Sequence, residues 1–151
     1  MKKNDLHISN IKDGTVIDHI AKGQALKILK ALDLDAQENT ISLGMRLKSN
    51  SLGKKDIIKL EEKELSPLQA NQLAIFAPDA TISIIRNWQV QRSFKVAMPK
   101  VLKKVLSCPN QACISQQLGI DSKFSVREKQ TEAELSCHYC EKEFLEEEME
   151  R

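Results

Sequence analysis

Aromatic side chains are scarce in this sequence, at 4% of 151 residues, so aliphatic side chains must fill its core. Long apolar runs are missing as well. Two lysines follow the first methionine, but no apolar stretch of 7–15 residues comes after them, which argues against a secretory signal. No stretch approaches the ~20 apolar residues that a membrane-spanning helix needs. We therefore expect a cytoplasmic protein without a membrane contact, in a compartment where structural disulfides are rare.

Motifs of the common catalytic classes are also missing. The sequence contains no G-x-S-x-G, no P-loop and no G-x-G-x-x-G. Asp18 stands beside His19, but neighbouring residues of a strand point to opposite faces, so the two are not expected to work as a base and its orienting group. The sequence favours a binding or regulatory protein, and a small enzyme with an undetected catalytic group is a less favoured alternative.

The only four cysteines lie in the last third of the chain. Cys108 and Cys113 form a C-x4-C pair, and Cys137 and Cys140 form a C-x2-C pair. Two such pairs direct four thiolates to one point, as a tetrahedral Zn²⁺ requires, so we predict one structural zinc per chain. Two disulfides, four unrelated thiols and an iron–sulfur cluster are the alternatives. His138 lies inside the second pair and is expected to be a bystander, because four cysteines complete the shell.

Charge divides the chain into a basic and an acidic part. Residues 101–151 carry a net charge of −3 and residues 1–100 a net charge of +5. The cysteine-bearing part holds few large apolar residues, so metal binding is expected to supply folding free energy there. A nucleic-acid-binding zinc ribbon, the alternative function, would need Lys and Arg to neutralise phosphates. The acidic balance therefore favours docking onto a protein and no contact with nucleic acid.

The first hundred residues alternate strand-like and helical segments. Strands are expected at 6–11, 14–20, 39–47, 54–61 and 80–90, and helices at 23–34 and 65–78. The second helix has Ser66 as N-cap, Pro67 at its first position, Gln69 completing a capping box and Pro78 as its stop. After the first strand this is the β-α-β-β-α-β order of a ferredoxin-like fold, an α+β class with two helices on an antiparallel sheet.

Pro99 marks the expected boundary between two domains, at 1–99 and 100–151. Residues 91–104 are interpreted as the connection. Strands at 123–128 and 133–137 alternate with period two and predict a small all-β, zinc-ribbon-like second domain.

Five segments in order resemble the regulatory chain of aspartate carbamoyltransferase. They read GTVIDHI, GKKDIIKLE, LSPLQANQLAIFAPDATI, CPNQACIS and CHYCEKEF, and the resemblance runs from about residue 6 to residue 145. It implies a non-catalytic chain whose first domain binds CTP as inhibitor, ATP as activator and UTP alongside CTP, with Mg²⁺ a possible companion ion. It also implies feedback control of pyrimidine biosynthesis, a second domain that holds a zinc through four cysteines and contacts the catalytic chain, a homodimer of regulatory chains, and a holoenzyme of two catalytic trimers and three regulatory dimers.

The resemblance also implies the positions of the nucleotide pocket. Asp18 would accept a hydrogen bond from a ribose hydroxyl, His19 would face the phosphates, and Lys59 would contact ribose and base. Backbone groups would read the base edge and further side chains would line the far wall: Ile8, Ser9, Asn10 and Ile11 for the first, and Ser83, Ile85, Trp88 and Val90 for the second.

Ser93 departs from the family pattern, which has a phosphate-binding lysine at this position. Arg92 or Lys95 is expected to substitute for it. At the contact with the catalytic chain, Asn110 and Lys142 match the family, whereas Ala112 replaces an asparagine.

Overall fold

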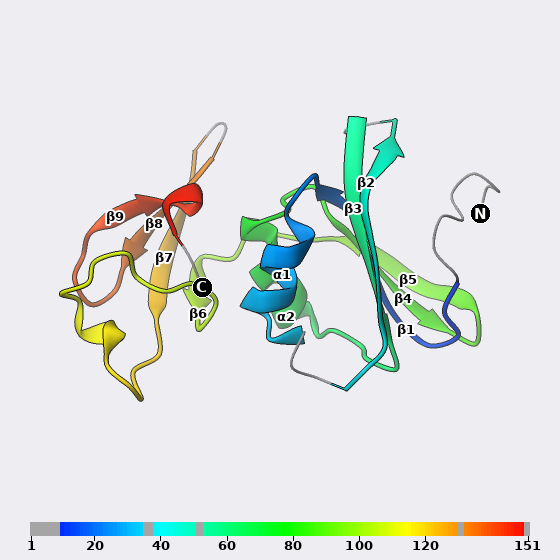
Figure 1. Cartoon of the computed structure of the whole chain (residues 1–151), viewed down its shortest axis with the longest axis horizontal. Coiled ribbons are helices and arrows are strands. Elements are labelled where there is room, and N and C mark those ends of the chain that lie inside the picture. Colours follow the sequence, from blue (N-terminus) through cyan, green and yellow to red (C-terminus); the bar gives the residue numbers. More distant parts are fainter. Residues whose placement is uncertain (1–9, 35–37, 51–52, 130–131, 150–151) are drawn as a thin grey trace.

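A computed structural model describes residues 10–34, 38–50, 53–129 and 132–149. Two units lie side by side in Figure 1, a five-stranded sheet with its helices and a smaller four-stranded sheet. The helices lie on the side of the larger sheet that faces the smaller unit, so they separate the two sheets (Figure 1). No helix among the described residues is long and apolar enough to cross a bilayer.

The larger unit has the predicted ferredoxin-like order with one strand added. Its elements are β1 (Gly14–Ala21), α1 (Ala25–Ala31), β2 (Ile41–Ser49), β3 (Gly53–Glu61), α2 (Pro67–Gln72) with a 3-10 turn η3 (Leu73–Ile75), β4 (Thr81–Arg86) and β5 (Gln89–Lys95). The strands pair antiparallel in the order β2-β3-β1-β4-β5. The α+β class with two helices is therefore confirmed.

The last strand of this sheet was predicted wrongly. Residues 80–90 form a hairpin rather than one strand, because Asn87 and Trp88 adopt φ values of 52° and 71° and reverse the chain. Positive φ at both central residues is the geometry of a two-residue hairpin turn. The chain returns as β5, which occupies part of the predicted connection. Residues 10–11 lie in no strand, and the rest of the expected strand at 6–11 falls outside the described residues.

A bulge interrupts β1 at a position that matters for the site. Ile17 pairs with Ile58 and Ile20 with Asp56, so two residues of β1 stand opposite one residue of β3. His19 has a φ of 59°, as an inserted bulge residue allows. Ile17 and Ile20 are both fully buried, and therefore both Asp18 and His19 stay outside the core. The expected strict alternation of these two side chains is wrong.

The start of each helix is fixed by a different device. The capping box of α2 is confirmed, since the backbone N–H of Gln69 donates to Ser66 Oγ at 3.2 Å and that of Ser66 donates to Gln69 Oε1 at 3.1 Å. Helix α1 has no side-chain cap of its own. Asp56 of β3 replaces it, because its fully buried carboxylate accepts from the backbone N–H groups of Gly23 and Ala25 at 3.0 and 3.2 Å.

The smaller unit contains β6 (Val101–Lys103), a 3-10 turn η4 (Ile114–Gln116), β7 (Lys123–Glu128), β8 (Ala133–Cys137), β9 (Glu143–Leu145) and a 3-10 turn η5 (Glu146–Glu148). The two predicted strands are confirmed as β7 and β8, and the sheet has the order β6-β7-β8-β9. Its buried side chains, among them Leu102 and Phe124, join those of the larger unit in one apolar cluster.

Candidate metal centre and effector face

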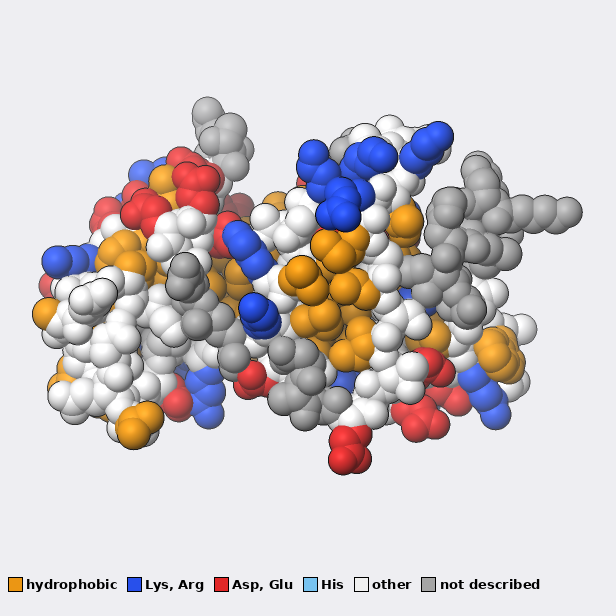
Figure 2. All heavy atoms as spheres, viewed as in Figure 1, with side chains coloured by type: hydrophobic (Ala, Val, Ile, Leu, Met, Phe, Trp, Pro, Cys, Tyr) orange, Lys and Arg blue, Asp and Glu red, His pale blue; other side chains and the backbone are white. Residues whose placement is uncertain are grey.

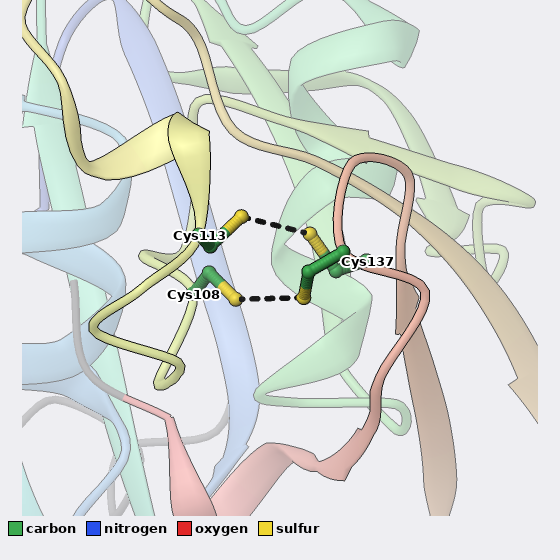
Figure 3. A group of neighbouring side chains, drawn as sticks. Cys108, Cys113 and Cys137 are labelled. Atoms are coloured by element: carbon green, nitrogen blue, oxygen red, sulfur yellow. Dashed lines mark hydrogen bonds between the residues drawn. The ribbon is translucent and has the colours of Figure 1, made fainter.

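The four cysteine sulfurs form one compact group. Cys108 and Cys113 come from the loop after β6, and Cys137 and Cys140 come from the end of β8 and the turn that follows. Figure 3 shows Cys108 and Cys113 on one loop with their sulfurs directed toward the second loop, where Cys137 lies. The four sulfurs lie within 4.8 Å of one another, and His138 is not part of the group.

The spacing of the sulfurs fits a metal rather than disulfides. A tetrahedral site with Zn–S bonds of about 2.3 Å separates its sulfurs by roughly 3.8 Å. The Cys108–Cys140 and Cys113–Cys137 sulfurs are both 3.7 Å apart. A disulfide would bring two sulfurs to about 2.05 Å. Since soft thiolates select zinc or iron, the donor set suits a structural metal such as zinc.

Protonation of the four thiols is set by burial and by the loop backbones. Burial raises the pKa of Cys108 to about 12, and burial also raises the pKa of Cys137. Burial opposes ionisation of Cys140 too, but hydrogen bonds from the backbone of Lys142 and the side chain of Asn110 outweigh it and lower the pKa of Cys140 to about 6. The loops thus favour a thiolate at this ligand before the metal arrives.

Asn110 and Lys142, the two predicted contacts for a partner, therefore meet at the sulfur of Cys140 although 32 residues separate them in the chain. The Asn110 side chain also accepts from the N–H of Ala112 at 3.1 Å, which shapes the first cysteine loop. Lys142 is exposed. A bound metal would fix both loops, and with them this patch of surface.

A second group of polar side chains lies on the outer face of the larger sheet, opposite the helices. Asp18 forms an ion pair with Lys55 at 2.9 Å. Lys59 lies opposite Val16 of β1 and Ser42 of β2. The residue is buried, with only 5% of its surface exposed. Burial lowers the pKa of Lys59, while the charge of Asp18 opposes that change.

Register places further residues in rows on this outer face. Val16 stands opposite Ser83, and Ser83 stands opposite Ser93, with 2.6 Å between the two hydroxyl oxygens. Asp18 stands opposite Thr81, and Thr81 stands opposite Lys95. Residues that pair across antiparallel strands point to the same face. We call Asp18, Lys55, Lys59, Thr81 and Lys95 the effector face, because the family resemblance implies a nucleotide pocket at Asp18 and Lys59.

Arg92 is not brought to the effector face. It pairs with Ile84, whose buried side chain belongs to the helix-covered face. Its guanidinium lies 3.7 Å from a carboxylate oxygen of Glu64 and 5.8 Å from the ring centre of Phe94. Of the two expected substitutes for the missing lysine, only Lys95 shares a face with Asp18 and Lys59.

The remaining predicted pocket residues lie around one end of the sheet. Ile85 is buried and pairs with Gly14, whereas Trp88 and Val90 are 62% and 60% exposed at the β4–β5 turn. Gly14 must be glycine, because its φ is 144° and an added Cβ would lie 1.9 Å from the carbonyl oxygen of Leu60.

Two more of the predicted positions, Asn10 and Ile11, come before β1 in the chain. Asn10 is exposed and Ile11 is buried, while Ile8 and Ser9 fall outside the described residues. His19 has a buried Nδ1 without a hydrogen-bond partner among the described residues. Its backbone N–H donates to Asp18 Oδ1 at 2.7 Å.

Sequence reasoning missed Lys55 and Thr81 as neighbours of Asp18. The signal for Lys55 was present, because strand alternation in KKDIIKLE places it on the same face as Lys59. The short distance between Lys55 and Asp18 depends on the bulge in β1, and the sequence pattern does not predict that bulge. Figure 2 shows other lysines and arginines gathered at the β2–β3 end of the larger unit, where this strand begins.

Comparison with known protein families agrees with this two-part architecture. The model of the aspartate carbamoyltransferase regulatory chain, allosteric domain, matches residues 6–97, and that of the regulatory chain's metal binding domain matches residues 100–150. The chain belongs to this family. As an aspartate carbamoyltransferase regulatory chain, it is a non-catalytic, regulatory component of an enzyme of pyrimidine biosynthesis. It has an allosteric domain and a metal-binding domain.

Individual relatives are similar over nearly their whole length. The regulatory chain of Aeromonas hydrophila is 45% identical over 143 residues, which cover 95% of this chain and 93% of the relative. That of Tolumonas auensis is 44% identical over 146 residues, covering 97% and 95%. That of Yersinia enterocolitica is 45% identical over 139 residues, covering 92% and 90%.

Proposed function

We propose that this regulatory chain binds CTP, ATP and UTP on its effector face and transmits their effect to aspartate carbamoyltransferase catalytic chains through a zinc-bound second domain. The observation that carries the proposal is the buried Lys59 beside Asp18. Lys59 is only 5% exposed and lies on the same face as Asp18, so this face presents an ammonium group and a carboxylate to a polar ligand. A nucleotide offers hydroxyls to Asp18 and base or ribose oxygens to Lys59.

Lys95 is the proposed anchor for the phosphates in place of the family's lysine at Ser93. It stands two positions further along β5, in the row of Asp18 and Thr81. A lysine on a four-carbon stem can span that shift, and phosphate recognition by an ammonium group needs no fixed fork geometry. His19 lies next to the same row, so Mg²⁺ or the phosphates of the nucleotide would approach it there.

The second domain is proposed to hold one structural zinc through Cys108, Cys113, Cys137 and Cys140. The metal would not take part in chemistry, since four cysteines leave no open position. Its role would be to fix the Asn110 and Lys142 surface for the catalytic chain. The division into domains at 1–99 and 100–151, a cytoplasmic location, a homodimer, and a holoenzyme of two catalytic trimers and three regulatory dimers belong to the same proposal.

Two measurements test the proposed function. Titration calorimetry on the purified chain should detect binding of CTP, ATP and UTP. Activity of the complex reconstituted with catalytic chains should change when each nucleotide is added, and catalytic chains alone should stay active without responding. A reconstituted complex that is indifferent to all three nucleotides, at concentrations where calorimetry shows binding, would contradict the regulatory role.

The docking surface is tested by Lys142→Ala. A partly buried interfacial charge costs about 2–5 kcal/mol when its mate is left unpaired, so this variant should loosen the complex in sedimentation experiments. Nucleotide binding to the isolated chain should not change. Removal of the metal with a thiol-reactive mercurial should release the catalytic chains entirely, and a complex that survives complete metal loss excludes the docking role of the four cysteines.

A further inference from the structure

The last turn among the described residues lies against the larger unit. Turn η5 follows β9 directly, and the N–H of Met149 donates to the carbonyl oxygen of Glu146 at 3.0 Å. Met149 is only 5% exposed and belongs to the shared apolar cluster.

One ion pair connects this turn to the first domain. Glu146 Oε1 lies 3.6 Å from Lys27 Nζ of α1, and the Glu146 side chain is 19% exposed. The neighbouring Glu147 is exposed and forms no ion pair with a described residue. Of the three consecutive glutamates in η5, only Glu146 therefore faces a cation across the boundary between the described parts of the two units.

A second set of contacts holds the linker on the other helix. The N–H of Ala97 donates to Asn71 Oδ1 at 3.0 Å, and Gln72 Nε2 donates to the carbonyl oxygen of Val101 at 3.5 Å. These bonds hold the covalent connection between the units against α2. The Lys27–Glu146 pair joins α1 to η5 and is a separate polar contact between the units.

Helix α1 is also connected to the effector face, through two neighbouring residues of β3. Lys55, which pairs with Asp18 on the outer face, precedes Asp56, which points to the inner face and accepts from the N–H of Ala25. Lys27 follows two residues later in the first turn of α1. A displacement of β3 at residues 55–56 therefore moves the helix end that carries Lys27.

We propose that Lys27 and Glu146 form an electrostatic latch that fixes the second domain against α1 and carries the effector signal between the domains. The transmitting part of this proposal rests on the proposed function, whereas the latch itself does not. A signal that reaches β3 at Lys55 and Asp56 is passed to α1, and the latch converts the position of α1 into the orientation of the metal-binding domain. In this proposal the linker between the domains would serve as the hinge, held or released by the latch.

The decisive experiment is a charge reversal with a restoring swap. Lys27→Glu and Glu146→Lys each place like charges at the latch, and the double variant restores an opposite pair. Because a partly exposed pair is modest in strength, each single variant should reduce the ratio of activities with and without nucleotide about two- to fivefold in the reconstituted complex. The double variant should recover most of that ratio, and Glu147→Lys, the matched control in the same turn, should leave it unchanged.

Two further readouts separate failure of the latch from failure of the proposed function. Nucleotide binding to the isolated chain should persist in all four variants, because none of Lys27, Glu146 and Glu147 lies on the effector face. Hydrogen exchange of residues 145–149 should be faster in Glu146→Lys than in the Glu147→Lys control. If the parent complex does not respond to nucleotides, the proposed function is wrong. The difference in hydrogen exchange then remains as the test of whether the latch exists. Equal exchange in the two variants, or single reversals that keep the parent's response, would overturn it.

Discussion

Replacing Lys59 with methionine should make the chain more stable and a poorer nucleotide binder. Lys59 is 5% exposed, so its methylene stem already occupies a packed site that methionine can fill without leaving a cavity. The substitution removes the cost of burying an ammonium group. Asp18 keeps its ion pair with Lys55 at 2.9 Å and is not left alone. Because burial lowers the pKa of Lys59, its charged form is unfavourable in the folded state, and its removal should raise the free energy of unfolding.

The loss of function should be larger than the gain in stability. A hydrogen bond from a charged group to its ligand contributes about 1.5–3 kcal/mol, which corresponds to a roughly ten- to hundredfold weaker affinity for CTP. Urea titration in zinc-containing buffer measures the first quantity and calorimetry the second. Trp88 is the only tryptophan, so its fluorescence reports unfolding of the larger unit. Destabilisation by more than about 1 kcal/mol with unchanged CTP affinity would refute the reasoning and make Lys59 a structural residue.

The pH dependence of the difference between parent and variant provides an independent check. Burial lowers the pKa of Lys59 below its ordinary value of 10.5. Below the lowered pKa, Lys59 is charged in both states and the folded state bears the full cost of burial. As the pH rises from that lowered pKa toward 10.5, the folded state releases its proton first, so the parent gains stability in this window. The advantage of Lys59→Met should therefore shrink on the alkaline side, and an advantage independent of pH would contradict the assignment.

Three further outcomes follow from the geometry. Cys113→Ser should lose the metal, measured as a fall from one zinc per chain by elemental analysis, and a parent protein that carries no metal when purified under reducing conditions would contradict the site. Lys95→Ala should weaken binding of CTP by roughly tenfold or more while Arg92→Ala leaves it unchanged, because only Lys95 lies on the effector face; the reverse result in calorimetry would move the phosphates to the other face. Asp56→Ala should cost about 3–5 kcal/mol in urea titration, since it leaves three backbone N–H groups without their acceptor, and a cost below about 1 kcal/mol would show that α1 does not depend on it.

Local patterns in the sequence determined most of the elements and the metal site. The capping box at Ser66 and Gln69 could be predicted because both residues lie within one helical turn. The metal site could be predicted because each close pair of cysteines lies in one short loop, and the structure brings the four sulfurs together. The β-α-β-β-α-β order followed from hydrophobic periodicity, which is also local.

Tertiary structure alone decided what the effector face contains. The bulge at Asp18 and His19 depends on how β1 pairs with β3, and it places on one face two side chains that alternation would separate. Asp56 caps α1 from a position 31 residues away in the chain. Lys95 lies on the effector face and Arg92 on the opposite face because of the register of the edge strand β5, which the sequence did not predict. Such features depend on pairings between distant segments. The physical reason is that one residue of shift in register exchanges the two faces of a strand, while the local sequence stays the same.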